Sequence, residues 1–144
     1  MEIIRLANFR LIPLIVAIVM FGCSGGDSSN RTGSLQKAVD AADETAAIQT
    51  LRTIASAQLQ AKAVRGSYAD FNGLVQGGFL DQRFSGAAPM LRGYRFTISA
   101  DGDQFSVNAD PDPPLTGRHL YVDSMDNAIH VNSSAAANRN DPAL

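Results

Sequence analysis

The sequence predicts an α+β fold in which one long N-terminal helix packs on a small four-stranded antiparallel sheet. Apolar residues recur at helical spacing between Asp43 and Arg65, whereas four later segments alternate apolar and polar residues, as half-buried strands do. A run of strands that follows a single helix is typical of α+β folds. The 144 residues give room for one such domain.

The predicted helix is amphipathic. On a helical wheel with about 100° per residue, its apolar and polar residues occupy opposite arcs. The apolar arc holds Ile48, Leu51, Ile54, Ala55 and Leu59, and the polar arc holds Gln49, Thr53, Ser56 and Gln60. The helix begins either within Leu35–Ala42 or at Asp43. Its alanine-rich stripe is shallow, so we expect it to approach a flat surface, which is the sheet.

Charged residues mark the two ends of this helix. Asp43 and Glu44 suit the positive N-terminal end of the helix dipole, and Lys62 and Arg65 suit the negative C-terminal end. Gly66 is well placed to stop the helix, because glycine adopts the left-handed conformation of a helix C-terminus without steric cost.

Shorter elements complete the predicted domain, which spans residues 35–132. Tyr68–Gly78 reads as a short helix or turn, and Arg83–Arg92 as irregular chain. The four strands are Tyr94–Ile98, Phe105–Ala109, His119–Asp123 and Ala128–Asn132, with hairpin turns at Asp101-Gly102 and at Ser124–Asn127. The proline-rich segment Asp110–Gly117 is unsuited to a central strand. Residues 133–144 are small and polar, and we expect a disordered tail.

The N-terminus has the pattern of an export signal. Arg5 and Arg10 precede the apolar run Leu11–Phe21, which is too short for the roughly 20 residues of a transmembrane helix but suits a signal peptide. The run ends at Gly22-Cys23. This arrangement resembles a bacterial lipoprotein signal. That resemblance implies cleavage after residues 1–22 and acylation, for example with palmitate, of Cys23.

Two further points concern this N-terminal region. The alternative to a lipoprotein signal is an uncleaved signal anchor that begins near Ile3. Ser24, which follows the cysteine, resembles the residue found in lipoproteins sorted to an outer membrane. Residues 23–34 then comprise the acylated cysteine and a Gly/Ser-rich flexible linker. We therefore expect a protein of the cell envelope that faces the periplasm or the cell surface.

The order of elements from about Glu44 to Asn132 resembles the globular part of type IV pilin-like proteins and type II secretion pseudopilins. The residues that carry the resemblance are Ala46–Gln58, Gly66-Ser-Tyr68, Leu74-Val75, Gly78–Asp81, Gly93–Phe96, Gly117–Ser124 and Ala128–Val131. The chain departs from the family at its N-terminus. It has neither the Gly-Phe-Thr-Leu-Ile-Glu type of processing site nor the long apolar helix that packs inside a filament. The resemblance therefore implies a pilin-like head on a lipid anchor, and not a filament subunit.

Composition excludes several function classes. The net charge of −2 does not indicate a nucleic-acid partner. Cys23 is the single cysteine, so the domain has no disulfide framework and no cysteine-ligated metal. No serine lies in a nucleophile elbow, and no glycine-rich loop has the lysine of a phosphate-binding loop. We expect no enzyme activity and no cofactor.

Two weaker hypotheses concern metals. His119 and His130 on the last hairpin are candidates for a two-histidine metal site with Asp123, but solvent-facing strand positions are the simpler explanation of both histidines and the one we favour. Asp110, Asp112, Asp123 and Asp126 are weak calcium candidates, because aspartates in turns normally serve turn chemistry.

The sequence thus predicts a non-enzymatic, lipid-anchored envelope protein that makes protein–protein contacts in a secretion or pilus-type assembly. The exposed edge of the sheet or the loop Asp110–Gly117 is the expected contact region. The alternative is a ligand- or calcium-binding lipoprotein that faces the periplasm.

Overall fold

The computed structural model describes residues 28–144. The predicted signal peptide, Cys23 and the first part of the predicted linker lie outside the described residues. The linker prediction is wrong from Ser28 onward, because helix α1 begins there and not within Leu35–Ala42 or at Asp43.

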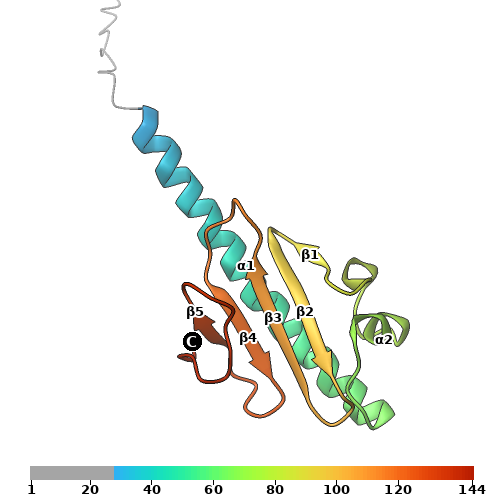
Figure 1. Cartoon of the computed structure of the whole chain (residues 1–144). Helices are drawn as coiled ribbons and strands as arrows, with labels where there is room; N and C mark the ends of the chain where they lie inside the picture. The colour runs from blue at the N-terminus through green and yellow to red at the C-terminus, as the bar shows by residue number, and fades with distance from the viewer. Residues whose placement is uncertain (1–27) are drawn as a thin grey trace, which may run out of the picture.

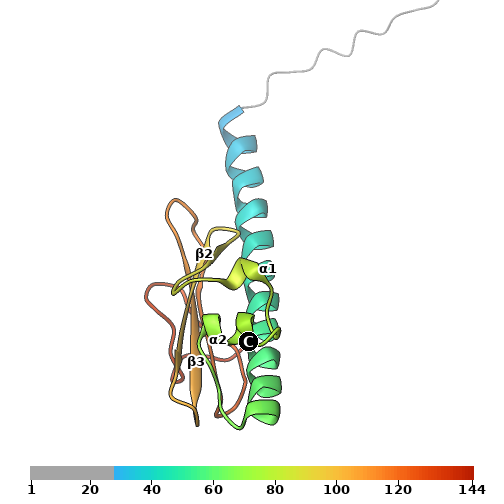
Figure 2. The same ribbon diagram turned by 90° about the vertical axis from the view of Figure 1, so that its right-hand side faces the viewer.

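The described chain forms two layers, with the long helix α1 packed on one face of an antiparallel sheet (Figures 1 and 2). The helices are α1 (Ser28–Arg65), α2 (Phe71–Gln76) and the short 3-10 helix η1 (Gln82–Phe84). The strands are β1 (Met90–Leu91), β2 (Tyr94–Ala100), β3 (Phe105–Pro111), β4 (His119–Asp123) and β5 (His130–Asn132). The α+β prediction is confirmed.

The sheet has five strands in the order β1-β2-β3-β4-β5, and each strand pairs antiparallel with the next. The prediction of four strands is therefore wrong by one. The missing strand, β1, is two residues long and lies in the segment that sequence indicated as irregular. It is too short to show an alternating pattern, and its pairing with Tyr94 and Arg95 is what identifies it.

Helix α1 is divided into two parts. Residues 32–39 are all exposed, and burial begins at Asp40. Figure 1 shows this N-terminal part extending past the end of the sheet, while the remainder runs obliquely across the sheet. Asp43 and Glu44 consequently lie in the middle of the helix, so their predicted role at its N-terminal end is wrong. Lys62 and Arg65 do lie in the last turn, and Gly66 follows with a φ of 79°.

The core forms between the buried stripe of α1 and the inward face of the sheet. Leu51 and Ile54 are fully buried, whereas Leu59, predicted on the same arc, remains 47% exposed. From the sheet, the alternating inward residues are Tyr94, Phe96, Phe105, Val107, Ala109, Leu120 and Val122. Burial of apolar side chains on both layers is the main stabilising contribution of such a core, at roughly 25 cal/mol per Å².

One polar side chain is buried in this core. Gln58 is 0% exposed, and its amide donates to the Ala69 carbonyl at 2.6 Å and accepts from the Ala69 amide at 3.0 Å. The Gln58 side chain therefore satisfies both backbone groups of Ala69, as a neighbouring strand would. These two bonds hold the segment that follows α1 against the helix. Alternating or helical patterns do not reveal such a residue, because a glutamine on a helix is usually solvated.

The C-terminal segment is ordered against the sheet, so the prediction of a disordered tail over residues 133–144 is wrong. The backbone bonds of Val131 to Pro142 and of Leu144 to Ile129 place the last residues beside β5. Ala137 is buried, and its carbonyl accepts a bond from the Asn108 side chain. Tertiary hydrogen bonds, and not an apolar pattern, order this segment.

Replacement of Gln58 by methionine tests its role. Methionine keeps the side-chain volume but leaves the amide and carbonyl of Ala69 without partners, and we expect the free energy of unfolding to fall by about 1 to 3 kcal/mol. The exposed Gln60→Met variant on the same helix is the matched control and is expected to change it by less than about 0.5 kcal/mol. Urea denaturation measures both, and equal effects contradict the role assigned to Gln58.

Candidate functional site

The two histidines lie on the outward face of the last hairpin, but each has its own carboxylate. His119 Nδ1 lies 2.6 Å from Asp110 Oδ1, and His130 Nε2 lies 3.1 Å from Asp126 Oδ2. In the register of β4 and β5, His119 pairs with Asn132 and His130 pairs with Tyr121, so the histidines are diagonal neighbours. The structure therefore does not bring them together around Asp123.

The calcium candidates are also separated. Asp112 pairs with Arg95 at 2.7 Å, and Asp123, whose side chain is 1% exposed, binds Arg139, Tyr121 and the amide of Met125. Asp110 and Asp126 hold the histidines. Within residues 28–144, no three histidine and acidic side chains gather in a group suited to a metal ion. The acidic loops thus serve turns and ion pairs in the described part of the chain.

His130 fastens the C-terminal segment. It is 6% exposed, and its Nδ1 lies 2.7 Å from the Asp141 carbonyl, which only accepts hydrogen bonds. Its Nε2 faces the Asp126 carboxylate, so the doubly protonated ring satisfies both partners. The bond to the Asp141 carbonyl raises the pKa of His130 above its ordinary value, burial opposes the shift, and Asp126 adds to it.

This geometry predicts a pH-dependent stability. Because the folded pKa of His130 exceeds its unfolded value, near 6.5, the contribution is complete below that pH and is lost as pH rises through the folded pKa. We expect the melting temperature of the unmodified chain to decrease as the pH rises over that range. In His130→Gln this decrease should be absent. His119→Gln is the matched control and should keep the fall, as followed by circular dichroism. A persistent fall in His130→Gln contradicts the assignment.

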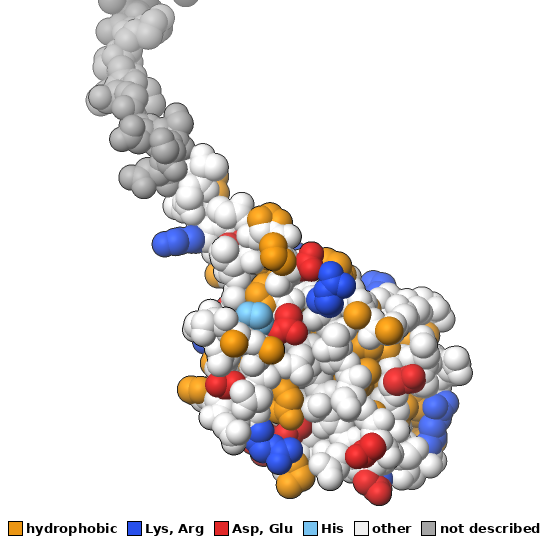
Figure 3. All heavy atoms as spheres, viewed as in Figure 1, with side chains coloured by type: hydrophobic (Ala, Val, Ile, Leu, Met, Phe, Trp, Pro, Cys, Tyr) orange, Lys and Arg blue, Asp and Glu red, His pale blue; other side chains and the backbone are white. Residues whose placement is uncertain are grey.

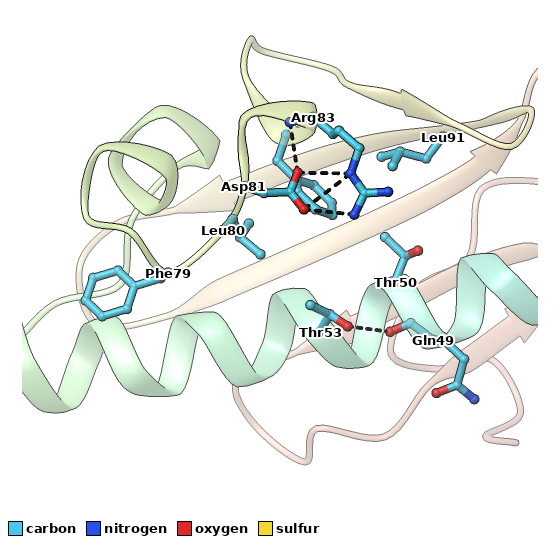
Figure 4. A pocket seen from close by; sticks show the side chains of 9 residues that line it. Gln49, Thr50, Thr53, Phe79, Leu80, Asp81, Arg83 and Leu91 are labelled. Atoms are coloured by element: carbon cyan, nitrogen blue, oxygen red, sulfur yellow. Dashed lines mark hydrogen bonds and ion pairs between the residues drawn. The ribbon is translucent and has the colours of Figure 1, made fainter.

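A shallow groove of about 270 Å³ lies between α1 and the chain that leads from α2 to β1 (Figure 4). Gln49, Thr50 and Thr53 line it on the helix side, and Phe79, Leu80, Asp81, Arg83, Phe84 and Leu91 line the other side. Four of the five polar side chains that line it are engaged within the described residues, and the exception is the side-chain amide of Gln49. Asp81 and Arg83 bind each other, and the two threonine hydroxyls donate to carbonyls of their own helix. The acid and the base of this groove thus compensate each other's charge.

The proline-rich loop is fastened to the middle of α1. Arg118 donates to Glu44 through Nε at 3.0 Å, through Nη2 at 2.6 Å and through its backbone amide at 3.1 Å. Thr116 donates to Asp40 at 2.7 Å, and the fully buried Tyr94 donates its hydroxyl to the Arg118 carbonyl at 3.2 Å. The predicted contact loop is thus held where α1 leaves the sheet. The partners Arg118 and Glu44 lie 74 residues apart in the sequence, and Thr116 and Asp40 lie 76 apart, so no local sequence pattern indicated these contacts.

Electrostatics reinforce this fastening. Burial acts to raise the pKa of Glu44, but the hydrogen bonds and charge of Arg118 outweigh it, and the pKa lies below its ordinary value. Burial raises the pKa of the Tyr94 phenol, with a further increase from the negative charge of Glu44. Tyr94 accordingly remains a neutral donor, and Glu44 remains a charged acceptor near neutral pH.

Loss of the Glu44 carboxylate is expected to loosen the loop. We predict that Glu44→Ala lowers the free energy of unfolding by about 1 to 2 kcal/mol and speeds tryptic cleavage after Arg118. Asp43→Ala is the matched control, because Asp43 faces a 70% exposed Arg92 at 3.5 Å and should contribute less than about 0.5 kcal/mol. Because the Glu44 pKa is lowered on folding, its contribution is present above the unfolded pKa and is lost as pH falls through the folded one. Unchanged cleavage in Glu44→Ala contradicts the fastening.

Two features of the surface bear on contacts with other molecules. In the view of Figure 3, which shows the face of the sheet turned away from α1, charges of both signs are scattered and no large patch of one sign is present. Leu35 and Val39, one helical turn apart on the part of α1 that extends past the sheet, are 67% and 53% exposed.

No family model matches the chain, and neither does any curated protein or solved structure. Among residues 28–144, no helix combines the length and the apolar character that crossing a bilayer requires.

Proposed function

We propose that this protein is a lipid-anchored component of the cell envelope whose pilin-like head makes protein–protein contacts in a secretion or pilus-type assembly. The observation that carries the proposal is the division of α1. Its C-terminal part is buried under the sheet, and its N-terminal part leaves the sheet with Leu35 and Val39 exposed. Exposed apolar side chains on a helix that stands clear of its own domain favour contact with another protein.

The arrangement of elements adds support. One long N-terminal helix under an antiparallel meander is the kind of layout that the sequence resemblance to pilin-like proteins and pseudopilins implies. The part of α1 that precedes Asp40, residues 28–39, is about 18 Å long at about 1.5 Å per residue, and it sets the head off from its point of attachment.

The anchor in this proposal rests on the sequence. The apolar run ends at Gly22-Cys23, and only four residues separate this cysteine from the start of α1 at Ser28. Two or three acyl chains, each methylene contributing about 0.8 kcal/mol, hold a protein at a bilayer durably. A head attached in this way stands at the outer membrane, facing the periplasm or the cell surface.

Replacement of Cys23 by serine tests the anchor. The variant is expected to move from the membrane fraction to the soluble fraction and to lose incorporation of an alkyne-labelled palmitate, with an unchanged melting temperature. Ser24→Ala is the matched control and should remain membrane-bound and labelled. If Cys23→Ser stays with the membrane and keeps the mass of the control, the lipid anchor is excluded.

A second test concerns the assembly. In cells that lack the native gene, Leu35→Glu combined with Val39→Glu is expected to abolish restoration of secretion or piliation, because charges replace the exposed apolar pair. Lys37→Glu on an exposed position between them is the control and should restore it. Full restoration by the double variant, at normal protein levels, argues against a contact through this part of α1.

A further inference from the structure

A second groove lies on the opposite flank of α1, between the helix and the turn that joins β4 to β5. It has a volume of about 360 Å³. Its lining residues are Arg52, Ala55, Ser56 and Leu59 from the helix, and Val122, Asn127 and Ile129 from the hairpin. Four of these seven side chains are apolar, and Leu59 departs from the predicted buried arc because it forms part of this open wall.

Arg52 is the charged residue of this lining, and it has no ion-pair partner among the residues that the structure describes. Each ion pair within residues 32–144 joins an acidic side chain to a cation other than Arg52. The Arg52 side chain also makes no hydrogen bond with the described residues. A guanidinium offers five donors in a planar fork that matches a carboxylate.

Asn127 lies on the other side of the groove. Its backbone has a φ of 53°, and its amide is held by a bond to the Asp123 carbonyl. Its side-chain amide makes no hydrogen bond with the described residues, so it is available to a ligand. The guanidinium of Arg52 and the amide of Asn127 thus lie beside the apolar side chains of the groove. A ligand complementary to this site carries a negative charge.

We propose that this groove binds a peptide segment of a partner protein in which an apolar side chain lies next to a carboxylate. The apolar side chain packs on Leu59, Val122 and Ile129, and the carboxylate accepts hydrogen bonds from Arg52. This inference deepens the proposed function, on which it rests, by naming the chemistry of the partner. The groove is distinct from the exposed pair Leu35 and Val39, which lies on the far part of α1.

Selection from a random 12-residue peptide library on the immobilised full chain in detergent tests this proposal. The expected peptides carry an apolar residue beside Asp or Glu, and exchange of that acid for its amide is expected to weaken binding at least tenfold. Arg52→Glu should weaken binding at least tenfold, and Leu59→Gln should also weaken it. Lys37→Glu, which reverses another exposed charge on α1 outside the groove, is the matched control and should bind as the unmodified chain does.

Several outcomes overturn the proposal. They are failure to enrich any peptide, enriched peptides without an acid, and equal binding by the Arg52→Glu and Lys37→Glu variants. Displacement of the peptides by palmitate assigns the groove to a fatty acid instead. Self-association that Arg52→Glu abolishes assigns it to a second copy of the chain. These results are independent of the Cys23→Ser and Leu35/Val39 experiments, because peptide binding is measured on purified protein without membrane or assembly.

Discussion

Burial of one face of α1 against the sheet is the interaction on which the rest of this structure depends. An isolated helix of about a dozen residues or fewer is marginal in water, so residues 32–39 remain helical chiefly because they continue a helix that the sheet already holds. Leu51 and Ile54 supply the helix side of that contact, and Tyr94 and Phe96 supply part of the sheet side. In turn, α1 covers the inward face of the sheet (Figure 2).

The same contact creates both candidate binding regions. Because the sheet is shorter than α1, the helix leaves it near Asp40 and presents Leu35 and Val39 beyond it. Because a cylinder on a flat sheet touches it along one line, grooves remain on its two flanks. On the flank toward η1, Asp81 and Arg83 form an ion pair with each other. On the flank toward β4 and β5, Arg52 has no ion-pair partner in the described part of the chain.

Most of the fold was predictable from periodicity. The strand His119–Asp123 has the predicted bounds, and the glycine that ends α1 and the Asp101-Gly102 hairpin are where turn chemistry placed them. The errors share a physical cause. The start of α1 at Ser28, the strand β1 and the ordered segment 133–144 depend on long-range contacts or on continuation of a packed element, which local patterns do not encode. For the same reason, no pattern indicated that Glu44 meets Arg118, that Gln58 is buried, or that Arg52 faces an apolar groove.

Hydrogen–deuterium exchange along α1 tests the division of this helix most directly. In the purified chain, the account predicts the slowest exchange for the amides of residues 51–61, at rates set by global unfolding, and much faster exchange for residues 32–39. In native envelope membranes, exchange at residues 32–39 should slow once a partner covers Leu35 and Val39. Uniform protection along the helix of the purified chain, or no change at residues 32–39 in the envelope, would contradict the account.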